Sequence, residues 1–132
     1  MAVGSAFGWL ACWFEGCAYG QETVFGPLAG DLPDSFGVRG LRYQTQLIGL
    51  ALSLLALLLV LALRRRVRPV QLFWLALLAL SAGRVVVGLL RGDAAPMLGQ
   101  LRLDVVADAI LALVALAAIV SIWAMGKVGG RP

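Results

Sequence analysis

The sequence predicts an all-α integral membrane protein with four transmembrane helices. Of its 132 residues, 61% are hydrophobic, and the mean hydropathy is +0.93, whereas soluble domains are about 45–50% apolar. Four apolar runs lie between polar or basic segments, and each is close to the length of about 20 residues that spans a bilayer. Residues 1–132 are therefore expected to form a single membrane domain.

The first apolar run predicts a transmembrane helix over residues 2–19. It is uncharged up to Glu15 and continues into Gly16-Cys17-Ala18-Tyr19-Gly20. A cleaved signal peptide normally begins with basic residues, and none precedes this run. A retained helix is therefore favoured.

The two cysteines, Cys12 and Cys17, are interpreted as small packing residues. On one continuous helix their side chains would lie about 140° apart, too far for a disulfide, although a break near Gly16 would change this. Their spacing of five residues is not a usual zinc pattern.

Residues 20–45 predict an external loop, and residues 46–63 predict the second transmembrane helix. The loop is polar and rich in proline and glycine, and a short hairpin is expected around Val24–Phe25 and Phe36–Val38. The second helix is leucine-rich on all sides, as a lipid-facing helix would be.

The basic turn over residues 64–69 sets the predicted topology. Arg64-Arg65-Arg66-Val67-Arg68-Pro69 directly follows an apolar helix, and such a block lies in the cytoplasm by the positive-inside rule. Residues 70–90 then predict the third helix and residues 104–125 the fourth. Residues 91–103 form an external loop in this topology, and residues 126–132 form a cytoplasmic tail. Both termini are then cytoplasmic.

Arg84 lies within the third apolar run. It is six residues from the end of the run, which places it about 9 Å inside. A guanidinium in a bilayer costs about 2.5–3.5 kcal/mol at the centre, so Arg84 needs a partner. Arg91 follows seven residues later on nearly the same helical face.

The predicted topology gathers polar side chains near the external leaflet. In one interpretation, Arg84 pairs internally with Asp108 or Glu15. In the other, Arg84 and Arg91 hold a lipid phosphate through paired hydrogen bonds. The two interpretations are compatible. The residues concerned are Glu15, Gln46, Arg84, Arg91, Asp104 and Asp108.

Enzyme and nucleic-acid functions have little support in the residues. The chain has no histidine, which removes the commonest general base and metal ligand. Metal and nucleotide motifs are absent from the sequence, and no catalytic residue is assigned. The net charge of +4 is better explained by topology and anionic lipid than by nucleic acid.

The order of motifs resembles the prolipoprotein diacylglyceryl transferase family. The motifs are Gly16-Cys17-Ala18-Tyr19-Gly20, Tyr43-Gln44-Thr45-Gln46-Leu47, the basic block, Arg84-x6-Arg91-Gly92-Asp93 and Gly99-Gln100-Leu101-Arg102. They cover nearly the whole chain but correspond to the C-terminal half of the family, whose members carry about three helices before this point. The family transfers a diacylglyceryl group from phosphatidylglycerol to a lipoprotein cysteine at the outer face of the bacterial inner membrane.

The resemblance implies a lipid-binding set and also shows departures from the enzymes. Arg84 matches a functional arginine, Arg91 closes the same motif, and Gly20 closes the signature stretch; Gln46 is grouped with them. The departures are Trp9 and Cys12 in place of an arginine and an asparagine, and Gly88 in place of a glutamate.

Three functions remain open. The first is a non-catalytic subunit of a larger bacterial inner-membrane complex, with other integral membrane chains as partners and phosphatidylglycerol as the candidate bound lipid. In this reading Glu15, Asp104 and Asp108 provide the intramembrane charge pairing, and no other cofactor is expected. The second is half of a split transferase that works with another chain. The third is a small membrane protein in which Arg84 is merely paired internally.

Overall fold

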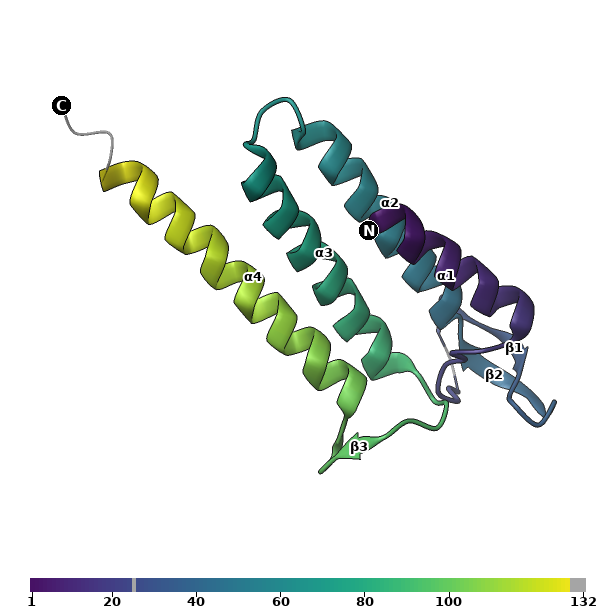
Figure 1. The fold of residues 1–132 in the computed structure, drawn as a ribbon. Coiled ribbons are helices and arrows are strands. Elements are labelled where there is room, and N and C mark those ends of the chain that lie inside the picture. The colour runs from purple at the N-terminus through teal and green to yellow at the C-terminus, as the bar shows by residue number, and fades with distance from the viewer. Residues whose placement is uncertain (25, 129–132) are drawn as a thin grey trace.

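The structure is a computed structural model that describes residues 1–24 and 26–128. Its described helices are α1 (Ala2–Glu15), α2 (Thr45–Leu63), α3 (Pro69–Leu90) and α4 (Leu103–Val128). Each helix packs on the next one in the chain, and two small hairpins lie at the same end of the bundle (Figure 1). The α2–α3 turn and the C-terminal end of α4 lie at the opposite end.

Three of the helices that the structure describes are long and apolar enough to cross a membrane. The candidate spans are Thr45–Leu63, Pro69–Leu90 and Leu103–Gly126. Helix α1 is apolar but has only 14 residues, and its length of about 21 Å is less than the hydrocarbon thickness of about 30 Å. The structure therefore supports a mostly helical membrane protein with three candidate spans, where the sequence predicted four.

Helix α1 ends at Glu15, four residues before the end of the expected helix over residues 2–19. Gly16 adopts a left-handed conformation with φ of 71°, and the N–H groups of Gly16 and Cys17 both donate to the carbonyl of Cys12. This is a glycine cap, which terminates a helix.

The same break joins the two cysteines. Cys12 and Cys17 form a disulfide, with their Cα atoms 4.7 Å apart. The interpretation of both as separate packing residues was wrong because the helix does not continue through Gly16.

Small residues allow the helices to approach closely. A Cβ atom on Gly49 of α2 would lie 2.3 Å from Cε2 of Trp9, so the indole rests directly on the glycine. A Cβ atom on Gly88 of α3 would lie 2.5 Å from Cγ2 of Val105 on α4. Close backbone approach at small residues is a usual basis of helix packing in membranes.

The first loop contains a hairpin, but in a different place from the one expected. Strands β1 (Ala29–Pro33) and β2 (Arg39–Tyr43) pair antiparallel, with Ala29 opposite Tyr43. The expected Phe36–Val38 strand is instead the turn, because the Asp34 carboxylate accepts the N–H groups of Phe36 and Val38. Val24 lies outside the strands, and residue 25 lies outside the described residues.

An extended segment after α1 links it to α2 and α3. The Gln21 N–H donates to the Leu90 carbonyl, and the Gly92 N–H donates to the Tyr19 carbonyl. At the start of α2, the Thr45 hydroxyl donates to a backbone carbonyl of the same segment. The second hairpin, β3 (Met97–Leu98) with β4 (Leu101–Arg102), leads into α4. These contacts hold the hairpin end of the bundle together.

Candidate functional site

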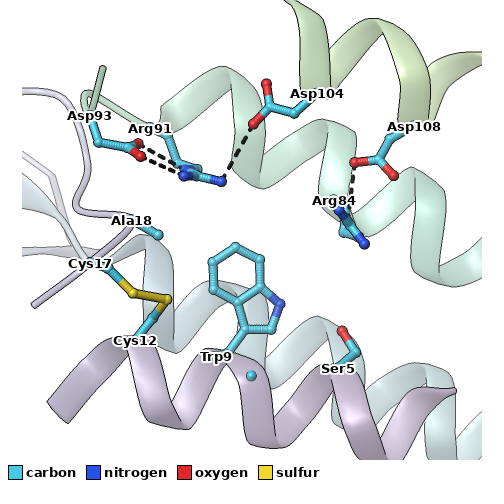
Figure 2. Close-up of a pocket in the computed structure, with 11 residues that line it drawn as sticks. Ser5, Trp9, Cys12, Cys17, Ala18, Arg84, Arg91, Asp93, Asp104 and Asp108 are labelled. Carbon is cyan, nitrogen blue, oxygen red and sulfur yellow. Dashed lines mark hydrogen bonds and ion pairs between the residues drawn. A yellow bond between two sulfur atoms is a disulfide. The ribbon is translucent and has the colours of Figure 1, made fainter. Parts of the chain in front are cut away.

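A cavity of about 320 Å³ opens between α1 and the ends of α3 and α4. We call it the Arg84 cavity. Figure 2 shows side chains of α1 facing the charged groups of α3 and α4 across it. The residues that line it are Ser5, Gly8, Trp9, Cys12, Cys17, Ala18, Arg84, Arg91, Asp93, Asp104 and Asp108.

Arg84 pairs with Asp108 of α4. The Arg84 Nε donates to Asp108 Oδ2 over 3.1 Å. The Asp108 side chain is only 9% exposed, whereas that of Arg84 is 57% exposed. Among the described residues, the two terminal nitrogens of Arg84 have no hydrogen-bond partner. The guanidinium is therefore anchored through one nitrogen and can bind a ligand with the other two.

Arg91 is fully engaged by carboxylates. It lies just beyond α3 with an extended backbone, and its side chain binds Asp93 through Nε at 2.8 Å and through Nη2. Its Nη1 is 3.4 Å from Asp104. The hydrogen bond to Asp93 raises the pKa of Arg91 further, so this guanidinium stays charged but has no free terminal nitrogen.

Arg102 completes this cluster from the second hairpin. Its side chain binds both oxygens of Asp104, at 3.1 and 3.2 Å, and it also reaches the backbone carbonyl of Asp93 at 2.8 Å. The cluster thus contains two guanidiniums and two carboxylates, which balance in formal charge.

The opposite wall of the cavity is mainly apolar and contains the disulfide. Trp9 projects from α1 toward the charged groups, and the Cys12–Cys17 disulfide lies beside it (Figure 2). Ser5, further along α1, is hydrogen-bonded to Ser53 of α2 over 2.9 Å. Helix α1 is thereby held against α2 while its Trp9 face lines the cavity.

Three residues grouped with this site in the sequence lie outside the cavity lining. Gln46 is 4% exposed, and its amide donates to the Cys17 carbonyl over 2.8 Å. Gly20 forms a backbone bridge to Arg91. Glu15 is exposed at the end of α1 and forms no ion pair within the described residues. The structure thus brings together Arg84, Arg91, Asp104 and Asp108 and leaves these three aside.

Asp93 and Arg102 belong to the site but were not predicted from the sequence. Both occur in the quoted motifs, but no spacing rule connects Asp93 to a hairpin residue nine positions later. The available signal was the short loop between α3 and α4. Because these two helices are neighbours, the ends of the loop that joins them must lie close together.

A second network, centred on the buried Arg42 of β2, was also missed. Arg42 is 7% exposed, and its Nη2 lies 2.7 Å from Glu22 and 3.3 Å from Asp34. Its guanidinium also lies 5.3 Å from the centre of the Tyr19 ring, within cation–π range. This network attaches the hairpin to the segment that follows α1, so it supports the cavity from outside.

The site has no metal-binding constellation in the part of the chain that the structure describes. Its three lining carboxylates are instead each paired with arginine. The arrangement can position an anionic or hydrogen-bond-accepting group at the free nitrogens of Arg84.

The comparisons with known proteins agree with the membrane architecture. A family model described as prolipoprotein diacylglyceryl transferase matches residues 1–123, and the chain therefore belongs to this family. No curated protein and no solved structure matches the chain.

Proposed function

We propose that this member of the prolipoprotein diacylglyceryl transferase family is a non-catalytic membrane subunit that holds an anionic phospholipid in the Arg84 cavity. The observation that carries the proposal is the state of Arg84. Its guanidinium is more than half exposed in the cavity and only its Nε is bonded to Asp108. The two remaining nitrogens suit a phosphate, which guanidinium binds through paired hydrogen bonds.

In this proposal Arg84 is the phosphate ligand, and Arg91 has a positioning role. Arg91 already binds Asp93 and Asp104, so a phosphate would have to displace a carboxylate to reach it. Gln46 and Gly20 act from behind the cavity, by fixing the segment that carries Cys17. The lipid proposed is phosphatidylglycerol, the donor lipid of the resembled enzymes.

Three positions support a non-catalytic role. At position 88, where the resemblance implies a glutamate, α4 packs directly on a glycine, and Val105 occupies the space of a side chain. At positions 9 and 12, a tryptophan and a disulfide cysteine line the cavity. The groups implied for transfer chemistry are thus replaced by apolar contacts.

The proposed setting is the bacterial inner membrane, with the disulfide and both hairpins outside and the termini in the cytoplasm. Disulfides persist in oxidising compartments, and the arginine block at the opposite end fits the positive-inside rule. We also propose that α1 enters the bilayer beside α2, because its large side chains Phe7 and Phe14 are exposed. The exposed apolar faces of the bundle would contact lipid and other integral membrane subunits.

The test is purification of the full chain in a mild detergent from its native membrane, with mass spectrometry of the proteins and lipids that accompany it. Wild type is compared with Arg84→Leu and with Arg39→Leu, which removes an arginine whose side chain is 70% exposed on the hairpin. We expect phosphatidylglycerol with wild type and Arg39→Leu, a large loss with Arg84→Leu, and a large assembly with wild type.

Two results would contradict the proposal. Equal lipid retention by Arg84→Leu and wild type would show that Arg84 does not hold the lipid. Recovery of one small helical partner together with diacylglyceryl transfer to a prolipoprotein cysteine would identify a split transferase.

A further inference from the structure

The charges of the bundle are separated along its length. The seven Asp and Glu residues lie at the end of α1, in the segments that carry the two hairpins or in the first two turns of α4. These parts meet at one end of the bundle (Figure 1), which we call the acidic end. Arg64, Arg65, Arg66 and Arg68 lie in the α2–α3 turn at the other end, which we call the basic end. Helix α3 separates the two ends by about 33 Å, far more than the screening length of about 8 Å in physiological salt. The carboxylates therefore cannot neutralise the basic end.

The arginines of the basic end are exposed to solvent or lipid head groups. Arg64, Arg65, Arg66 and Arg68 are all exposed, and none forms an ion pair with any side chain that the structure describes. This contrasts with the acidic end, where Arg42, Arg91 and Arg102 all bind carboxylates.

A second cavity, of about 330 Å³, lies at the basic end between the start of α3 and the end of α4. It is lined by Arg68, Gln71, Ile122, Trp123 and Gly126. Its polar side chains offer a guanidinium, an amide and an indole N–H, all of them hydrogen-bond donors. No carboxylate is among the described residues that line it, unlike the Arg84 cavity. This donor set suits an anionic group.

We propose that this second cavity binds the phosphate head group of an anionic phospholipid from the leaflet at the basic end. Arg68 binds the phosphate, and Gln71 and Trp123 form the walls around it. The lipid is favoured as the source of the phosphate because the cavity lies at the ends of two candidate membrane spans. Trp123 is 64% exposed and suits the interface, where tryptophan is enriched. This site is separate from the Arg84 cavity and does not depend on it.

The experiment uses the purified full chain in nanodiscs of phosphatidylcholine with phosphatidylglycerol added in steps. Native mass spectrometry counts the phosphatidylglycerol molecules retained. The variants are Arg68→Gln, which leaves Arg64–Arg66 in place, and Trp123→Leu, which changes the wall without changing charge. Arg39→Gln is the matched control, because it removes the same charge from the acidic end. Circular dichroism checks that each variant keeps its helix content.

We expect Arg68→Gln to weaken retention of one phosphatidylglycerol about tenfold, the order of one charge-assisted hydrogen bond to a phosphate. Trp123→Leu should weaken the same binding step, and Arg39→Gln should match wild type. Combination of Arg68→Gln with Arg84→Leu distinguishes the two cavities, since each substitution should remove a different lipid. If only the Arg84-dependent lipid is lost, the site at Arg68 is overturned and the proposed function stands. If only the Arg68-dependent lipid is lost, the proposed function is overturned and the site at Arg68 stands.

Three other outcomes would overturn the site at the basic end. Equal retention of phosphatidylcholine and phosphatidylglycerol would remove its selectivity for anionic lipid. An unaltered affinity in Trp123→Leu would show diffuse attraction to the arginines in place of a cavity. Displacement of the lipid by millimolar inorganic phosphate would identify free phosphate as the ligand.

Discussion

The ion pair between Arg84 and Asp108 is asymmetric in its exposure, and this makes its energetics testable. Arg84→Met leaves a carboxylate that is 9% exposed without its donor, and an unsatisfied buried polar group costs about 1–3 kcal/mol. Asp108→Leu leaves a guanidinium that is 57% exposed and can still reach water or a head group. The free energy of unfolding should then fall only by the contribution of an exposed ion pair, about 0–1 kcal/mol.

The two substitutions together should be less harmful than Arg84→Met alone. The double variant has no uncompensated charge, and a leucine at position 108 places an apolar side chain in a mostly buried site. We expect it to recover about 1 kcal/mol or more of what Arg84→Met loses, since removal of both partners of a buried pair is often close to neutral.

The assay is reversible unfolding in mixed micelles, with the free energy of unfolding measured for both single variants and the double variant. Arg39→Met and Asp31→Leu provide a matched pair on the hairpin, where the side chains are 70% and 65% exposed. Both should change the free energy of unfolding by under about 1 kcal/mol. If Asp108→Leu costs as much as Arg84→Met, or if the two losses simply add, burial of Asp108 does not govern the pair.

Two further predictions concern the end of α1 and the segment after it. Gly20→Ala should lower the free energy of unfolding by about 1–3 kcal/mol, because the new Cβ would lie 2.2 Å from a backbone carbonyl oxygen of β2. Gly8→Ala is the control in the same unfolding assay. Its Cβ would meet no atom within 4 Å, so it should be neutral or slightly stabilising. Cys17→Ser should cost about 2 kcal/mol, the chain-entropy value for so short a loop. A reductant should bring wild type to the same free energy and leave the variant unchanged, and equal effects on both would refute a stabilising disulfide with Cys12.

Much of the helical framework could be predicted from the sequence, because apolar runs and charged breaks are local signals. The observed α2, Thr45–Leu63, and α3, Pro69–Leu90, each start one residue before the expected ranges. A need for compensation at Arg84 also followed from the cost of a charge in an apolar run. Which acid would pair with Arg84 depended on helix packing, because Asp108 and Glu15 were predicted at the same depth and could not be separated by depth alone.

The end of α1 could not be predicted in the same way. Gly16 occurs in a run that is otherwise compatible with helix, and its left-handed conformation becomes clear only with the contacts around it. Once the chain turns there, Cys17 meets Cys12, and the next residues run back toward α3. A wrong helix boundary therefore had two consequences, a missed disulfide and a first span that was predicted too long.

The lack of a side chain at position 88 connects the packing of α4 with the charge on Arg84. Position 88 is four residues after Arg84, so a glutamate there would lie on the same face of α3 and could pair with it within the helix. In this chain, Gly88 lets Val105 approach α3, and this close packing brings Asp108, one turn further along α4, to Arg84. The charge on Arg84 is thus compensated by a neighbouring helix. Its orientation in the cavity consequently depends on the association of α3 with α4, and any ligand bound at its free nitrogens would sense that association.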